Sequence, residues 1–153
     1  AETLRWLTEE CMPYIDQTFD TERRERWLMG YSLAGLFALW AAYELDCFSG
    51  IICCSGSLWF QDWDIYVKEH TLHSKCKIYL SLGGREEKTK NKVMARVGDR
   101  TREQKKKLEK DPMAEQVFLE WNAGGHFADE GKRLAKGIRY LFHISQSGVN
   151  IKE

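Results

Sequence analysis

The sequence predicts an α/β fold in which a mostly parallel β-sheet is flanked by helices. Short, strongly apolar runs alternate with longer amphipathic or charged stretches along the whole chain. This alternation gives the order αβαβαβαβα, which is typical of parallel strands joined by helical crossovers. The apolar run Phe48–Ser55 is the pattern expected of a strand buried on both faces. At 153 residues, the chain is expected to form a single domain over residues 1–153.

The pattern of apolar and polar residues places each element in turn. Residues 3–15 are expected to be helical, with Leu4, Leu7 and Cys11 on one face and Pro13 closing the helix, and residues 16–24 form a polar connection. The first strand is expected at Arg26–Gly30. The remaining elements are a helix at Leu33–Leu45, a strand at Phe48–Ser55, a helix at Asp64–Leu72, a strand at Lys77–Leu82, a mostly helical stretch at Val93–Lys110, a strand at Gln116–Trp121 and a helix at Ala128–Ile144.

Composition argues against several classes of protein. Lysine plus arginine equals aspartate plus glutamate, 23 of each, and the basic stretch 85–110 has no interleaved aromatic residues, so no nucleic-acid partner is expected. No apolar run approaches the roughly 18–20 residues of a membrane helix. The five cysteines are odd in number and form no C-x-x-C pair, which favours a reducing cytoplasm and no structural metal. We therefore expect a cytoplasmic protein without a metal or organic cofactor.

The six residues Gly30-Tyr31-Ser32-Leu33-Ala34-Gly35 lie where an apolar strand ends and an apolar helix begins. This is the context of a nucleophile elbow, in which a serine occupies a strained turn with its hydroxyl exposed above the sheet. The usual pattern is G-x-S-x-G, and Ala34 stands where the second glycine is expected. The alternative interpretation is a serine-containing turn without a chemical role. We predict that Ser32 is a nucleophile.

A candidate general base follows the last predicted strand, in Asn122-Ala123-Gly124-Gly125-His126-Phe127. Two glycines before the histidine allow the loop to bend the imidazole back over the sheet. The chain order serine, acid, histidine is that of the α/β-hydrolase triad. The other histidines, His70, His73 and His143, lie in predicted helices or at their ends, where packing or surface roles are expected. We predict that His126 is the base.

The acid is sought in the loop after the third predicted strand. Glu86 is the first candidate and Glu87 the second, because a carboxylate at the carboxyl end of that strand is where the third member of a triad belongs. Such an acid would hold the imidazole in its working tautomer and stabilise the imidazolium. Alternatively, both glutamates are solvated and pair with Arg85 or Lys88.

Four stretches resemble a known family in the same order along the chain: Gly30–Trp40, Ser55–Phe60, Ser81–Asn91 and Gly124–Phe127. The chain resembles the C-terminal portion of the putative esterase family, the esterase D and enterochelin-esterase-like branch of the α/β-hydrolases. The resemblance implies a three-layer sandwich lacking the N-terminal strands. It also implies Ser32 as nucleophile, His126 as base and a carboxylate near position 86 as acid. Family members often carry aspartate where Gly84 stands, which leaves Glu86 as the better candidate.

The resemblance further implies that Tyr31, Ser57, Leu58 and Trp59 lie beside the substrate, and that the backbone N–H of Leu33 is one oxyanion donor. The expected function is hydrolysis of a small-molecule carboxylic ester through an acyl-enzyme, by a Ser-His-Glu triad or a Ser-His dyad. The alternatives are an acyltransferase using the same site and a non-catalytic interaction module with the hydrolase fold.

In the family, four more strands precede the nucleophile strand, whereas one predicted helix precedes it here. Arg26–Gly30 is therefore expected at the edge of the sheet, with unpaired backbone N–H and C=O groups that would favour association. Two arrangements would cover this edge. Either a further N-terminal segment pairs with it, or two copies of the chain form a homodimer edge to edge.

Overall fold

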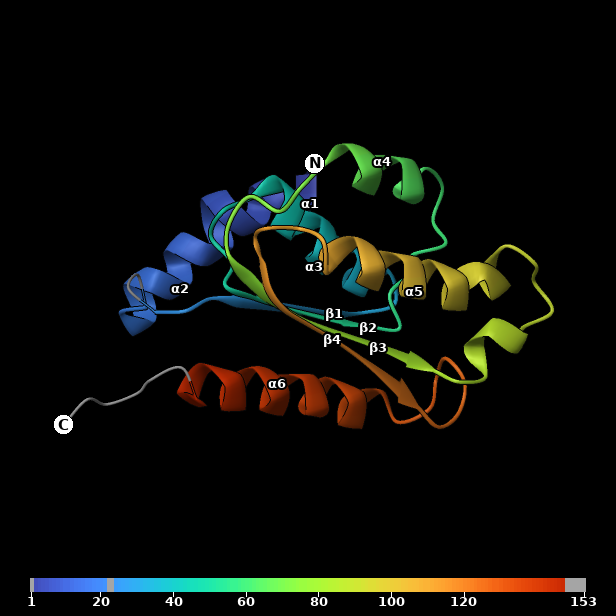
Figure 1. Cartoon of the computed structure of the whole chain (residues 1–153). Helices are drawn as coiled ribbons and strands as arrows, with labels where there is room; N and C mark the ends of the chain where they lie inside the picture. The colour runs from blue at the N-terminus through green and yellow to red at the C-terminus, as the bar shows by residue number, and fades with distance from the viewer. Residues whose placement is uncertain (1, 22–23, 148–153) are drawn as a thin grey trace.

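The computed structural model describes residues 2–21 and 24–147 and shows one parallel sheet between two layers of helices (Figure 1). The strands are β1 (Trp27–Tyr31), β2 (Gly50–Cys54), β3 (Cys76–Gly83) and β4 (Ala114–Asn122), in the spatial order β1-β2-β3-β4. Every neighbouring pair is parallel. Because all four strands are parallel, their carboxyl ends lie along the same side of the sheet.

A helix connects each strand to the next. Helices α3 (Leu33–Glu44), α4 (Trp63–Glu69) and α5 (Val97–Leu108) lie on one face of the sheet, and α6 (Glu130–Ser147) lies on the other (Figure 1). Two short 3₁₀ helices, η2 (Glu86–Lys88) and η3 (Met94–Arg96), lie between β3 and α5. The predicted α/β class, a parallel sheet flanked by helices in three layers, is confirmed.

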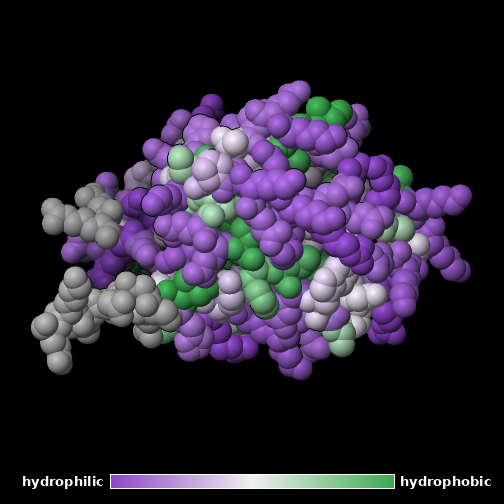
Figure 2. Space-filling view, in the orientation of Figure 1, coloured by the Kyte–Doolittle hydropathy of each residue, from purple (hydrophilic) through white to green (hydrophobic). Residues whose placement is uncertain are grey.

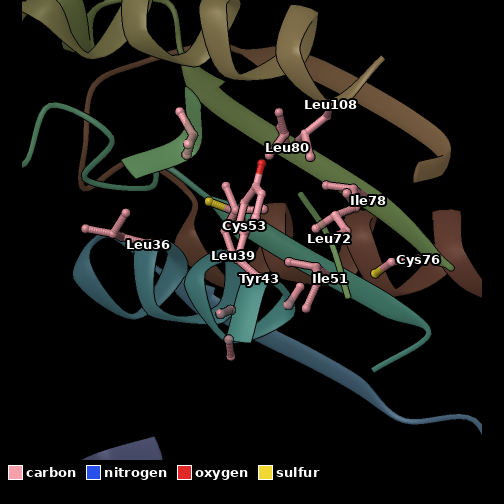
Figure 3. Close-up of a cluster of buried hydrophobic side chains, with 14 of the residues drawn as sticks. Leu36, Leu39, Tyr43, Ile51, Cys53, Leu72, Cys76, Ile78, Leu80 and Leu108 are labelled. Atoms are coloured by element: carbon pink, nitrogen blue, oxygen red, sulfur yellow. The ribbon is translucent and has the colours of Figure 1, made fainter. Parts of the chain in front are cut away.

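The larger core cluster lies between the sheet and the helices α3 and α5. Leu39 and Tyr43 of α3 pack against Ile51 and Cys53 of β2, and Leu108 of α5 belongs to the same cluster (Figure 3). A smaller cluster on the other face joins strand residues Ile52, Cys54 and Tyr79 to Leu141 of α6. Alternate residues of β2 thus point to opposite faces, and both faces are covered. This is why the strand is apolar throughout.

The N-terminal helix is longer than its sequence predicts. It runs through α1 (Glu2–Trp6), the π-helical turn η1 (Leu7–Cys11) and α2 (Met12–Phe19). Pro13 does not close the helix, because it lies in the first turn of α2, where a missing backbone N–H costs little. The connection therefore starts at Asp20, which has a left-handed φ of 50°.

Within the described residues, β1 pairs only with β2, from Trp27 opposite Gly50 to Tyr31 opposite Cys54. The strand therefore lies at an edge, and Met29 is 49% exposed there. What covers this edge stays a prediction. In the view of Figure 2, the surface over the helices is mostly hydrophilic, and hydrophobic residues gather at the level of the sheet. No helix in the described parts of the chain has the length and hydropathy required to cross a membrane.

Candidate active site

Four loops at the carboxyl ends of the strands bring the candidate residues together. Ser32 follows β1, Ser55 and Ser57 follow β2, Glu86 follows β3, and His126 follows β4. In open parallel sheets, this edge is where ligands bind, because the loops after the strands form a crevice there. Residues that are far apart in the sequence therefore converge on one place.

Ser32 occupies a sharp turn between β1 and α3. Its backbone has φ 58° and ψ −120°, a conformation that residues other than glycine rarely adopt. The turn is fixed by hydrogen bonds on both sides. The N–H of Ser32 donates to the carbonyl oxygen of Cys54 at 2.9 Å, and the carbonyl oxygen of Ser32 accepts from the N–H groups of Leu36 and Ser57, each at 3.1 Å. These bonds hold the hydroxyl above the end of the sheet.

Close backbone packing around this turn requires glycine at two positions. A Cβ atom on Gly30 would lie 2.1 Å from the carbonyl oxygen of Ala34, and one on Gly35 would lie 3.0 Å from the carbonyl oxygen of Gly30. Ala34, which replaces the second glycine of the usual pattern, is exposed. The departure from the pattern is therefore accommodated, because the tight contacts fall on Gly30 and Gly35.

The side chains of Ser32, His126 and Glu86 form a hydrogen-bonded line. His126 Nε2 lies 3.0 Å from Ser32 Oγ, and His126 Nδ1 lies 2.7 Å from Glu86 Oε2. A carboxylate only accepts hydrogen bonds, so Nδ1 carries the ring proton and Nε2 is left to accept from the serine hydroxyl. The side chain of Glu86 is 3% exposed and that of His126 is 27% exposed. The imidazole is thus accessible to solvent, whereas the carboxylate is almost fully buried.

The environment of Glu86 favours its ionised form. Burial acts to raise the pKa of the carboxyl group, but hydrogen bonds from Ser55, His126 and the backbone of Gly83 outweigh it and hold the pKa below its ordinary value. Glu86 Oε1 accepts from Ser55 Oγ at 2.6 Å and from the N–H of Gly83 at 2.7 Å. Glu87 instead pairs with Arg102 at 3.1 Å. Of the two candidate acids, Glu86 is the one that contacts the imidazole.

The loop that carries His126 is attached to the neighbouring strands. Gly124 has φ +91°, and its carbonyl oxygen accepts from the N–H of Arg85 at 3.0 Å. The hydroxyl of Tyr31 donates to the carbonyl oxygen of His126 at 2.5 Å. A Cβ atom on Gly125 would meet nothing within 4 Å, so only the first glycine of the pair is needed for the turn.

A cavity of about 280 Å³ opens beside Ser32 and His126, and Ser57 and Trp59 line it. Ser57 Oγ lies 3.4 Å from Ser32 Oγ. Leu58 is 1% exposed and belongs to the hydrophobic core, so it does not reach the cavity. The other lining residues are Ser55, Arg85, Glu86, Thr89, Met94, Val97 and Phe127.

Two further sequence candidates lie beside the cavity without lining it. Tyr31 lies against the imidazole, at 5.6 Å between ring centroids. Its hydroxyl donates to the backbone of His126 and does not line the cavity. Leu33 is the first residue of α3, so the helix offers no acceptor for its N–H. Within residues 2–21 and 24–147, no three His, Cys, Asp or Glu side chains gather in a way that could hold a metal ion.

Sequence reasoning missed Arg133 of α6, which is 1% exposed and forms an ion pair with Glu86 at 3.0 Å. A helical spacing of four residues places it on the same face as Gly137 and Leu141, both of which are buried. A charged residue in line with buried small and apolar residues is the signal that could have identified it.

Comparison with known proteins supports a shared fold. The model of a family described as Putative esterase matches residues 1–130. Siderophore hydrolases EstA and EstB from Aspergillus nidulans superpose with TM-scores of 0.77 and 0.75, at 20% and 19% identity, covering 94% and 91% of this chain and 57% of each of theirs. An IroE-like serine hydrolase from Shewanella oneidensis gives 0.75 at 20% identity, covering 92% of this chain and 46% of its own. No curated protein sequence matches. The chain thus spans about half the length of these solved structures.

Proposed function

Because the chain belongs to the putative esterase family, we propose that it is a serine hydrolase that cleaves a carboxylic ester through an acyl-enzyme intermediate. The observation that carries this proposal is the line of hydrogen bonds from Ser32 through His126 to Glu86. Nucleophile, base and acid are each within hydrogen-bond reach of the next, which is the geometry that activates a serine hydroxyl.

The proposed reaction has two steps. Ser32 Oγ attacks the ester carbonyl carbon while His126 Nε2 takes its proton, and His126 then gives that proton to the departing alcohol. Water next attacks the acyl-enzyme, with His126 again accepting and returning the proton, which releases the acid. The ionised Glu86 stabilises the imidazolium that forms in each step. The N–H of Leu33 supplies one hydrogen bond to the oxyanion.

The contact between Glu86 and His126 favours a triad over a dyad. A buried carboxylate that accepts from Nδ1 fixes the ring in the tautomer that can receive the serine proton. In a Ser-His dyad, no carboxylate would determine which nitrogen of the imidazole carries the proton. We therefore include Glu86, rather than Glu87, in the proposed catalytic group.

The test is a pair of measurements on the purified chain. Hydrolysis of p-nitrophenyl acetate or butyrate reports ester cleavage, and covalent labelling by a fluorophosphonate probe reports an activated serine. Ester-containing siderophores belong in the substrate panel, because EstA and EstB are described as siderophore hydrolases. Ser32→Ala should remove both signals. Ser74 lies just before β3, at the amino-terminal end of the strand and away from the candidate site. Ser74→Ala should therefore leave both ester hydrolysis and labelling unchanged.

A folded wild-type chain with neither ester hydrolysis nor labelling would contradict the proposal and favour a non-catalytic module. Labelling that survives in Ser32→Ala would assign the nucleophile to another serine.

A further inference from the structure

Arg133 makes an unusual set of contacts for a residue on the helical layer. Its Nη1 lies within hydrogen-bond distance of three oxygens, at 3.0 Å from Tyr31 Oη, 2.9 Å from Ser55 Oγ and 3.0 Å from Glu86 Oε1. Its Nη2 donates to the carbonyl oxygens of Gly125 at 2.9 Å and Ala123 at 3.2 Å. The guanidinium therefore joins α6 to segments that follow three of the four strands and to the last residue of β1.

Burying this side chain is costly. An arginine that leaves water must recover a large desolvation penalty through good geometry and hydrogen bonds. The recovery here is incomplete, because the Nε atom of Arg133 is buried without a hydrogen-bond partner. Replacement of a buried ion pair by apolar residues is often neutral or stabilising. Stability alone therefore gives a weak reason for an arginine at this position.

The contacts are instead arranged around the imidazole. One side of His126 contacts Glu86, whose other carboxylate oxygen is the one that Arg133 binds. The chain that precedes His126 is bound through the carbonyl groups of residues 123 and 125. One planar group thus holds both the acid and the loop that carries the base. Its fork of parallel N–H donors suits this task better than the single ammonium of a lysine.

A glycine makes room for this pair. A Cβ atom on Gly83 would lie 2.8 Å from Arg133 Nη2 and 2.9 Å from Glu86 Oε1, as well as 2.7 Å from the carbonyl oxygen of Gly124. No real Cβ atom fits at these distances. The end of β3 is therefore shaped to admit the guanidinium and the carboxylate together.

We propose that Arg133 is a positioning residue for the ester hydrolysis proposed above, one that holds Glu86 and the loop 123–125 so that His126 stays in line with Ser32. This inference rests on the proposed function. Arg133 does not line the cavity and acts only through Glu86 and the loop.

The experiment compares Arg133→Lys, which keeps the charge but loses the fork, with Arg133→Met, which loses both. Arg139→Lys is the matched control, because Arg139 lies on the same helix and is exposed. Each variant is measured for kcat and KM with p-nitrophenyl butyrate. Proton NMR of each folded variant follows the resonance of the proton between His126 Nδ1 and Glu86, which a merely structural role would not move.

Arg133→Lys should lower kcat by about 10²-fold, the size expected when a catalytic group is displaced by about 1 Å, with KM nearly unchanged. The bridging-proton resonance should shift or broaden. In Arg133→Met the missing cation leaves the buried Glu86 without its ion pair, so kcat should fall at least as far as in Arg133→Lys. Arg139→Lys should match the wild type.

Wild-type kcat in Arg133→Lys would overturn the proposal, as would a loss of kcat with an unchanged bridging resonance, or a change confined to KM. If Arg133→Met does not fold, Arg133→Lys decides. If neither folds, Arg133 is a core residue and the proposal fails. If the wild-type chain neither hydrolyses esters nor reacts with the fluorophosphonate, the proposed function fails, and the bridging resonance still shows whether Arg133 positions His126.

Discussion

Replacing Glu86 with glutamine should trap His126 in the wrong tautomer. Glu86 Oε1 is surrounded by donors, from the backbone of Gly83, from Ser55 and from Arg133. The glutamine must place its carbonyl oxygen there, so its NH₂ group takes the position of Oε2 and points at His126 Nδ1. An amide NH₂ donates, which obliges Nδ1 to accept and moves the ring proton to Nε2. Nε2 then cannot receive the proton of the serine hydroxyl.

The expected loss in kcat is on the order of 10⁴, the effect of the equivalent wrong-tautomer substitution in a serine protease. KM should change little, because Glu86 does not bind the ester in this mechanism. The release of p-nitrophenol under saturating substrate measures kcat. The substitution also leaves the charge of Arg133 unpaired in the interior, which costs about 3–5 kcal/mol of unfolding free energy. Circular dichroism must therefore establish that the assayed variant is folded.

Glu87→Gln is the matched control, because Glu87 pairs with Arg102 and does not contact His126. It should retain the activity of the wild type. If a folded Glu86→Gln variant keeps turnover close to that of the wild type, or if the two variants lose activity equally, the acid does not orient the histidine. The site would then work as a Ser-His dyad.

Three further predictions follow from the same geometry. The Ser32→Ala, His126→Ala double variant should have a kcat little lower than that of either single variant, because residues that act as a unit are not additive; independent, multiplying losses would show that the two do not act together. Gly30→Ala should destabilise the fold by about 1–3 kcal/mol or more in urea unfolding, because the added Cβ would lie 2.1 Å from the carbonyl oxygen of Ala34. Gly125→Ala is the control, because its added Cβ meets nothing within 4 Å and should change the stability little. Similar urea midpoints for the two variants would refute the packing argument. The pKa of Glu86 lies below its ordinary value of 4.5, so its ionised form stabilises the fold above that pH, and this contribution is lost as the pH falls through the lower folded-state pKa. Urea midpoints measured across the acid range should show this loss in the wild type and not in Glu86→Gln.

The sequence allows prediction of elements and motifs whose signal is local. The apolar runs predict all four strands to within a few residues, and the strand-to-helix position of Ser32 and the glycines before His126 select the two residues now found 3.0 Å apart. The sequence ranks Glu86 before Glu87, but no local signal decides between them. They are consecutive in a 3₁₀ turn with three residues per turn, so their side chains point about 120° apart, and only the fold shows which one faces the imidazole.

The features that sequence reasoning missed depend on tertiary packing. Arg133 has the same charge and helical context as the solvated Lys132 and Arg139 nearby, and it differs only in the face of α6 that it occupies. Pro13 would end a helix if it stood in an interior turn, but the π-helical turn η1 before it lets a new helix start there. Leu58 follows a serine that lines the cavity, yet its own side chain points into the core.

Two consecutive residues at the carboxyl end of β2 connect the segments that carry the candidate catalytic residues. Cys54 fixes the backbone of Ser32, and the next residue, Ser55, fixes Glu86, which in turn holds His126. Although Ser32 and His126 are 94 residues apart along the chain, a few hydrogen bonds that meet at the end of β2 hold both of them in place. Helices α4 and α5 contribute none of these hydrogen bonds. We therefore expect amide protons in these two helices to exchange with solvent well before the distance between Ser32 and His126 changes.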